Sequence, residues 1–270
     1  MGNSVNTNVG AMIALQSLNR TNAALDKTQK QVSTGYRVAD AADDGAAFAV
    51  AQGLRSMSKG YDAVGERLSA AKGLVSVASS GLTSISDTVA EARKVLTKLS
   101  DASLSANEFA QYNADYTALK TEATNFANQS SFNGVNLLVG TATTAIIYSA
   151  SGGTFTLTAQ DMVTKITAGL AAVTDAASSR TLLAGAFATF EGQVGTSLST
   201  LGGYTRSITN QANFTSVLND ATNEGIGNIV DADLAKASAQ LQSLQIRQQL
   251  GTQSLSIANQ APSALLNLFR

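Results

Sequence analysis

Two serine–lysine pairs are the residues whose types and spacing could carry covalent chemistry. In Ser56-x-x-Lys59 and in Ser69-x-x-Lys72, the lysine could activate the serine hydroxyl as a nucleophile. The Ser-Asp-Asn and Lys-Thr-Gly segments that complete such a site are absent from the sequence. Both pairs also fall inside one long helical pattern. We therefore interpret them as chance matches and predict no catalytic residue.

Three aspartates close together could suggest a cation site. Asp40, Asp43 and Asp44 do not have the spacing of a calcium-binding loop. Asp43 and Asp44 stand directly before a helix expected to begin near Gly45, where a carboxylate can accept hydrogen bonds from the first free backbone amides. Capping is therefore the preferred interpretation, and no metal site is predicted.

The composition removes several further kinds of site. The 270 residues include no histidine and no cysteine, so the commonest general base, the commonest metal ligand, thiol chemistry and disulfides are all lacking. Gly225-x-Gly227 lacks the strand-then-helix context of a nucleotide loop. A net charge of −1 gives no electrostatic case for nucleic acid or an anionic membrane. We expect no cofactor and no enzymatic activity.

The elements that would have to position any site are long helices. Between Val50 and Leu99, apolar residues recur at alternating spacings of four and three for about seven heptads. At about 1.5 Å per residue, such a helix is roughly 75 Å long. Similar stripes predict a second helix through residues 109–126 and a third from about 179 to 220. The single proline, Pro262, leaves these helices uninterrupted.

Only the middle of the sequence is typical of β structure. TTAIIYSASGGTFTLTA contains two short β-prone runs around a glycine turn, which predicts a hairpin. The expected fold is mainly α: a long antiparallel coiled-coil helical rod formed by the N- and C-terminal segments, with this small β-hairpin insertion at its tip. A second helix-capping hypothesis places Asp231 at the start of the C-terminal helix.

Both ends of the chain are free of charged residues over long stretches, from Met1 to Asn19 and from Gln248 to Phe269. Disordered tails are one interpretation. However, the ends keep heptad spacing, and burying an unpaired charge costs several kcal/mol. We therefore expect the ends to be buried when copies assemble. The predicted subunit-packing residues are Leu15, Leu18, Leu25, Val32, Leu234, Leu241, Leu244, Leu250, Leu255, Ile257 and Leu265.

These segments resemble bacterial flagellins. The N-terminal resemblance runs through SVNTNVGAMIALQSLNRTNAALDKTQKQVSTGYRVADAADDGAAFAVAQGLRS, and SSFNGVNLLVG is similar to the family's Phe-Asn-Gly segment. The C-terminal resemblance runs through NIVDADLAKASAQLQSLQIRQQLGTQSLSIANQAPSALLNLF. It covers roughly residues 1–140 and 180–270, and the three segments agree in order and spacing.

The resemblance implies a structural subunit that polymerises into the flagellar filament for swimming. It implies a terminal helical pair in the filament core (1–42 with 229–270), a helical rod domain (43–140 with 180–228) and a short insertion (141–179). The turn from terminal pair to rod would contain Arg37, Asp40, Asp43 and Asp44.

The resemblance also implies partners and a location. The chain would be exported to the extracellular filament without a cleaved signal peptide, by a flagellar export apparatus and a chaperone. It would then meet other copies, hook-associated proteins and a cap. Where the family's segment for the animal innate flagellin receptor has an arginine, this sequence has Glu91, which weakens the expectation of recognition.

Two alternatives stay open at this point. A hook–filament junction protein shares the terminal design. A surface polysaccharide-binding module could use the predicted hairpin, with Tyr148 and Phe155 as its aromatic residues.

Overall fold

The computed structural model describes residues 7–267, and the side chains of residues 7–260. The chain divides into two compact units. The terminal unit comprises the described residues up to Ser56 and from Ala221 onward, and the central unit is Met57–Asp220. Two long helices contribute to both units: α2 (Gly45–Leu99) and α6 (Ala188–Val230). The mainly helical fold class expected from the sequence is confirmed.

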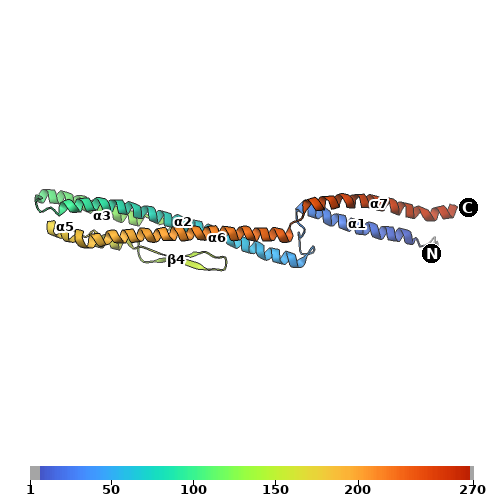
Figure 1. The fold of residues 1–270 in the computed structure, drawn as a ribbon, viewed down its shortest axis with the longest axis horizontal. Helices are drawn as coiled ribbons and strands as arrows, with labels where there is room; N and C mark the ends of the chain where they lie inside the picture. Colours follow the sequence, from blue (N-terminus) through green and yellow to red (C-terminus); the bar gives the residue numbers. More distant parts are fainter. Residues whose placement is uncertain (1–6, 268–270) are drawn as a thin grey trace. The chain divides into compact units, whose positions relative to one another are not determined.

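Helices α2, α3 (Ala106–Gln129) and α6 lie side by side in the central unit (Figure 1). The turn into α3 is fixed by a capping box. The Ser105 hydroxyl accepts a hydrogen bond from the Glu108 backbone amide, and the Glu108 carboxylate accepts one from the Ser105 amide. These reciprocal bonds satisfy amides that have no partner within the helix. As a result α3 runs back along α2.

The core of the central unit follows the apolar stripe of α2. From Val64 to Leu99 the stripe residues are buried, and Leu82, Ile85 and Leu96 have no exposed surface. Farther toward the start of α2 the stripe is not covered: Val50 is 55% exposed and Met57 is 47% exposed. Helix α3 ends where Ser130 meets Gly81, and nearer the start of α2 residues that follow α3 lie on the helix instead: Phe132 against Gly73 and Ala150 against Gly60.

Facing helices complete this core. The apolar stripe of the third predicted helix is buried at Phe187, Phe190 and Leu201. Phe187 ends the π-helical turn Leu183–Phe187, which leads into α6. Two short helices, α4 (Met162–Gly169) and α5 (Ala176–Leu182), pack against the same cluster.

Two antiparallel hairpins follow α3 in the central unit. The first joins β1 (Ser131–Phe132) to β2 (Val135–Asn136) through a turn in which Asn133 and Gly134 both have positive φ. The second joins β3 (Thr143–Ile147) to β4 (Thr154–Thr158).

The β3–β4 hairpin exists as predicted, but its expected place at the tip is wrong. Ala150 in its turn packs on Gly60, and Tyr148 lies by Leu68 and Gln211, so it lies against the sides of α2 and α6. Because α3 carries the chain back by 24 residues before β1 begins, the insertion starts beside the middle of α2.

The terminal unit is built on an antiparallel pair, α1 (Val9–Thr34) and α7 (Leu234–Asn267) (Figure 1). The Asn8 side chain donates to the Ala258 carbonyl at 2.7 Å, and Gln248 donates to Asn22 at 2.9 Å. Gly251 lets α7 approach Leu18 closely. Among the described residues, no helix is long and apolar enough to cross a membrane.

Candidate functional site: the terminal helix pair and its turn

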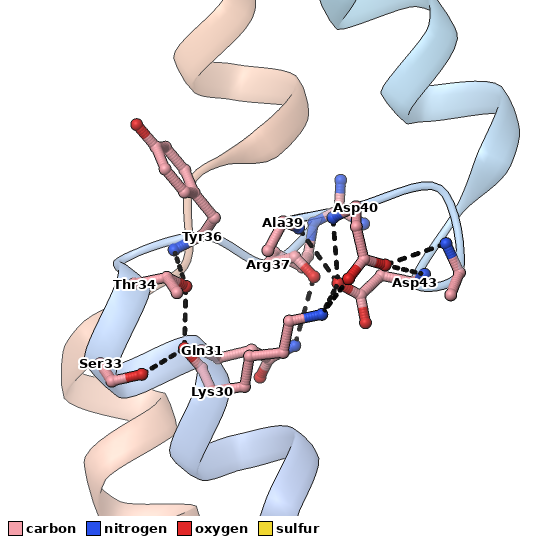
Figure 2. A network of polar contacts seen from close by, with 10 residues as sticks. Lys30, Gln31, Ser33, Thr34, Tyr36, Arg37, Ala39, Asp40 and Asp43 are labelled. Atoms are coloured by element: carbon pink, nitrogen blue, oxygen red, sulfur yellow. Dashed lines mark hydrogen bonds and ion pairs between the residues drawn. The ribbon is translucent and has the colours of Figure 1, made fainter.

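The turn between α1 and α2 is held by one lysine and two aspartates. The Lys30 ammonium lies 2.6 Å from an Asp40 carboxylate oxygen and 3.0 Å from an Asp43 oxygen (Figure 2). Hydrogen bonds to Lys30 lower the pKa of both carboxyl groups and raise the pKa of Lys30. The Asp40 side chain is half exposed, so solvent weakens this ion pair, whereas only 15% of the Asp43 side chain is exposed.

The two aspartates also organise the loop backbone. Asp43 accepts hydrogen bonds from the Ala39 amide at 3.1 Å and from the Asp40 amide at 3.4 Å. Asp40 accepts in return from the amides of Ala42 and Asp43. Backbone amides that point at a carboxylate stabilise its charged form. The role of the two carboxylates here is therefore to fix a turn.

Asp44 caps the long helix, as the capping hypothesis predicts. Its carboxylate accepts a hydrogen bond from the Ala47 amide at 3.0 Å. The second capping hypothesis is wrong in its residue: Asp233, not Asp231, accepts from the Lys236 amide at the start of α7. Since an N-cap is the residue directly before the first helical one, Asp233 fits α7, which begins at Leu234.

Arg37 ties the turn to the end of α6. Its guanidinium donates to the Ile229 carbonyl, and its backbone amide donates to the Val230 carbonyl at 2.7 Å. The next residue, Val38, is buried with Ala51 and Val230. The chain therefore passes from α1 to α2, and from α6 to α7, through one shared cluster.

A short backbone ladder joins the α1–α2 connection to the α6–α7 connection, and these two connections together are called the joint below. Tyr36 pairs with Asp231 in an antiparallel bridge, and the Ala232 amide donates to the Gly35 carbonyl at 2.9 Å. Gly35 has φ 75°, a conformation that costs glycine little and other residues more. All four predicted turn residues thus lie in or directly beside this joint. Lys30 was missed, because it lies ten and thirteen residues before its partners and no local motif marks it.

The terminal pair buries only part of its apolar surface. Of the predicted packing residues, Leu244 is buried, and Leu18, Leu25, Val32, Leu241 and Leu255 are half-buried. Four others are exposed: Leu15 (47%), Leu234 (50%), Ile257 (60%) and Leu250 (62%). Leu265 lies in the last turns of α7, where side chains are outside the described residues.

Further exposed apolar side chains extend this surface. Val9, Met12 and Ile13 on α1 are 60% to 64% exposed, and Ile246 on α7 is 58% exposed. None of these four was among the predicted packing residues. For the three on α1, the position within the charge-free segment before Arg20 is the signal that could have identified them. Scattered exposed apolar residues are ordinary, but a run of them on the charge-free stretches of a helix pair indicates an interaction surface.

Within the described part of the chain, no group of three or more histidine, cysteine, aspartate or glutamate residues is placed to hold a metal ion. Both serine–lysine pairs lie on the continuous helix α2, and Gly225 and Gly227 lie inside helix α6. The arrangement described here is suited to binding another protein surface.

Comparisons with known proteins agree at both ends of the chain. Residues 5–143 match the bacterial flagellin N-terminal helical region, and residues 190–269 match the bacterial flagellin C-terminal helical region. The chain is 38% identical to flagellin FljM of Caulobacter vibrioides over 272 residues, covering 99% of each chain. It is 31% identical to a flagellin of Brucella melitensis over 288 residues, again covering 99% of each chain.

A solved structure is similar in fold. A Vibrio parahaemolyticus protein described as flagellar hook-associated aligns with a TM-score of 0.59, covering 70% of this chain and all of that one. At 12% sequence identity this likeness concerns the fold alone.

Proposed function

The chain belongs to the bacterial flagellins and is a structural subunit of the flagellar filament, and from that premise we propose that its terminal helix pair is the surface through which copies pack in the filament core. In this proposal residues 1–42 with 229–270 form the core, 43–140 with 180–228 form an outer helical domain, and 141–179 form a short insertion.

One observation carries the proposal: four exposed apolar side chains of the pair lie in segments without charge. Leu250 and Ile257 fall within Gln248–Phe269, and Met12 and Leu15 fall within Met1–Asn19. Fully burying such a side chain is worth about 1.5–3 kcal/mol. Because no ionised group has to be desolvated with them, this gain is not offset by the cost of burying a charge.

The chemistry of the remaining surface supports the same reading. Between the apolar positions α7 carries glutamine, asparagine, serine and threonine, which can donate and accept hydrogen bonds with a neighbouring copy. The pair already uses such contacts within the chain, as Gln248 with Asn22 does. Uncharged polar groups of this kind suit a surface that is exposed to solvent in the free subunit and buried in the polymer.

The turn residues are proposed to hold together the connections between the helices of the terminal unit. Arg37, Asp40, Asp43 and Asp44 hold the connection between α1 and α2 through the contacts described above.

Export and further partners are inferred from family membership. We infer that the subunit leaves the cell without a cleaved signal peptide, guided by a chaperone and a flagellar export apparatus. In the extracellular filament it would contact itself, other flagellins, and hook-associated and cap proteins. We further propose that its role is structural and not catalytic.

The test is a charge placed where it would be buried only in the polymer. Leu250→Asp is expected to abolish growth from short filament seeds at near-neutral pH, measured by light scattering and electron microscopy. Because Leu250 is 62% exposed, the helix content and melting temperature of the free subunit should not change. Leu250→Met, which keeps the apolar surface, is the matched control and should grow normally.

Leu255→Asp provides a second position on the same helix. It should also block growth, although its half-buried side chain means that the free subunit is destabilised as well. Normal seeded growth of both aspartate variants would show that this face of α7 is not buried in the filament.

A further inference from the structure

One side of α7 packs on α1, and the residues on that side follow a regular spacing. Between residues 234 and 260, the buried and half-buried residues are spaced alternately four and three apart: Ala237, Leu241, Leu244, Gln248, Gly251, Leu255 and Ala258. Such spacing keeps one side of a helix toward its partner. We call this set the inner face of α7. Gln248 is the one member of the set with a polar side chain.

A second apolar set lies on the opposite side of α7. Its members are Ile246, Leu250 and Ile257, and all three are exposed. Each of them comes two residues after a member of the inner face. At 3.6 residues per turn, two residues correspond to about 200° around the helix axis. The helix therefore has two apolar faces, and we call the exposed one the outer face.

Apolar burial by itself does not decide which face of α7 packs on α1. A displacement of α7 by two residues, about 3 Å along its axis, would bring Leu250 to the place of Gln248. Ile246 and Ile257 would take the places of two leucines in the same movement. The outer face is entirely apolar, whereas the inner face contains a glutamine. Contacts other than apolar burial must therefore favour the observed packing.

A hydrogen bond between two side chains joins the inner face to α1. The Gln248 amide nitrogen donates to the Asn22 side-chain oxygen at 2.9 Å, and both side chains are half-buried. Within the described residues, the Asn22 side chain forms no other hydrogen bond. With α7 displaced by two residues, Asn22 would face Leu250, and its amide would be shielded from water without a partner, which is costly. Polar residues at single seam positions fix the alignment of helices in coiled coils.

Two further contacts fit the inner face and not the outer one. Gly251 leaves room for Leu18, whose Cδ1 lies 3.1 Å from the point where a Cβ would be. The displaced helix would place Gln253 against Leu18 instead. Farther along the pair, the Asn8 side chain donates to the Ala258 carbonyl at 2.7 Å. Both contacts lie in the same part of α7 as the outer face.

We propose that Asn22 and Gln248 determine which face of α7 packs on α1, and therefore which face the subunit presents to other copies. The hydrogen bond between them makes the entirely apolar face the costlier one to bury within the chain. Ile246, Leu250 and Ile257 stay exposed in the free subunit for this reason. Their use in contacts between copies rests on the proposed function, whereas the choice of face does not.

The test probes both sides of α7 in the free subunit and uses the absence of cysteine from the chain. Gln253→Cys places a single thiol on the outer side, at an exposed position, and Ala258→Cys places one on the inner face. Each is combined with Asn22→Leu, and the rate of reaction with a maleimide is measured. Asn22→Leu is expected to slow labelling at position 253 and to speed it at position 258, each by about fivefold or more.

Asn19→Leu is the matched control. It makes the same exchange on α1, but Asn19 is exposed, and the bond between Asn22 and Gln248 is kept. Labelling at both positions should equal that of the chain with the cysteine alone. If Asn22→Leu loses helix content, Asn22→Met replaces it, because methionine is a flexible apolar residue that adapts to its surroundings.

Slower labelling at position 253 is the decisive result. If the bond between Asn22 and Gln248 only stabilised the pair, its loss would let the pair open. Labelling at position 258 would then become faster, and labelling at position 253 would not become slower. That outcome, or unchanged rates at both positions, would overturn the proposal.

Growth on filament seeds separates this proposal from the proposed function. With the outer face turned toward α1, Asn22→Leu should grow about tenfold more slowly than Asn19→Leu. If labelling shows the exchanged face but growth is normal, the choice of face stands and the proposed packing surface is wrong. If labelling is unchanged while Leu250→Asp still blocks growth, the choice of face is refuted and the packing surface stands.

Discussion

The terminal and central units carry similar apolar spacing in sequence and use it in different ways. In the central unit, Leu82, Leu96 and Phe187 have no exposed surface. In helix α1 the one buried residue is Thr28, although the helix contains Met12, Ile13 and Leu15. The apolar side chains of the pattern are thus buried within the chain in the central unit and remain exposed in the terminal unit. A heptad stripe identifies a buried surface, but not the molecule that buries it.

The two units also differ in where charged side chains lie. Arg93 of α2 forms an ion pair with Glu191 of α6, and its guanidinium lies 5.4 Å from the Phe187 ring centre. These groups lie at the edge of a core that the chain itself completes, where charge is compatible with water. The outer parts of α1 and α7 have no such groups, which is expected where a surface is to be covered later.

The largest expected effect is the loss of a core side chain. Phe187→Ala should lower the free energy of unfolding by about 3–5 kcal/mol, because it removes a fully buried ring and leaves a cavity. Phe214→Ala on the same long helical segment is the control; its ring is 55% exposed, and its effect should stay within about 0.5 kcal/mol. Denaturant unfolding measures both, and equal losses would contradict the packing described for the central unit.

Replacing one glycine in each unit by alanine compares how tightly the two units are packed. A Cβ at Gly169 would lie 2.2 Å from the Phe190 Cβ, so Gly169→Ala should destabilise the central unit by about 1–3 kcal/mol. A Cβ at Gly251 would lie 3.1 Å from Leu18 Cδ1, the flexible end of a side chain. Since alanine favours a helix over glycine by about 1 kcal/mol, Gly251→Ala should be neutral or stabilising.

Thermal unfolding of the two alanine variants decides the comparison. Should Gly251→Ala lower the melting temperature as much as Gly169→Ala does, the terminal pair is as tightly packed as the core of the central unit.

The smallest effect concerns the turn at acid pH. Lys30 lowers the pKa of Asp40 and Asp43, so their contribution to stability is present above about pH 4 and is lost as the pH falls through their lowered pKa values. The pKa of Lys30 is raised, so the contribution of Lys30 to stability is lost only at alkaline pH, above about pH 10.4. Lys30→Met should therefore melt earlier than the unaltered chain at pH 7.

That difference should shrink as the pH is lowered below 4. Comparing the two chains at each pH removes the contribution of other carboxyl groups with lowered pKa values, such as Asp101 and Glu108. A difference that stays constant down to acid pH would mean that the ion pairs do not stabilise the turn.

Local patterns in the sequence predict much of this fold. Seven heptads in α2 and the glycine turn between β3 and β4 each contain their own physical reason, so both are predicted from the residues alone. The exposure of Val50 and Met57 depends instead on which later parts of the chain lie against α2, which no pattern within α2 records.

The candidate site shows the same limit. Asp44 could be identified as a cap because the cap and its amide are three residues apart. The partners of Lys30, the contact of Arg37 with Ile229 and the choice of Asp233 over Asp231 depend on where the chain returns in space.

The pairing of α1 with α7 also affects the order in which the parts of the chain can fold during synthesis. The bond between Asn22 and Gln248 joins residues 226 positions apart. At a synthesis rate of about 5–20 residues per second, α1 is complete roughly 10–40 seconds before the ribosome reaches α7. During that interval α1 has no partner within its own chain. Any protein that meets the growing chain then finds Met12, Ile13 and Leu18 uncovered, and the terminal pair is the last part of the molecule that can form.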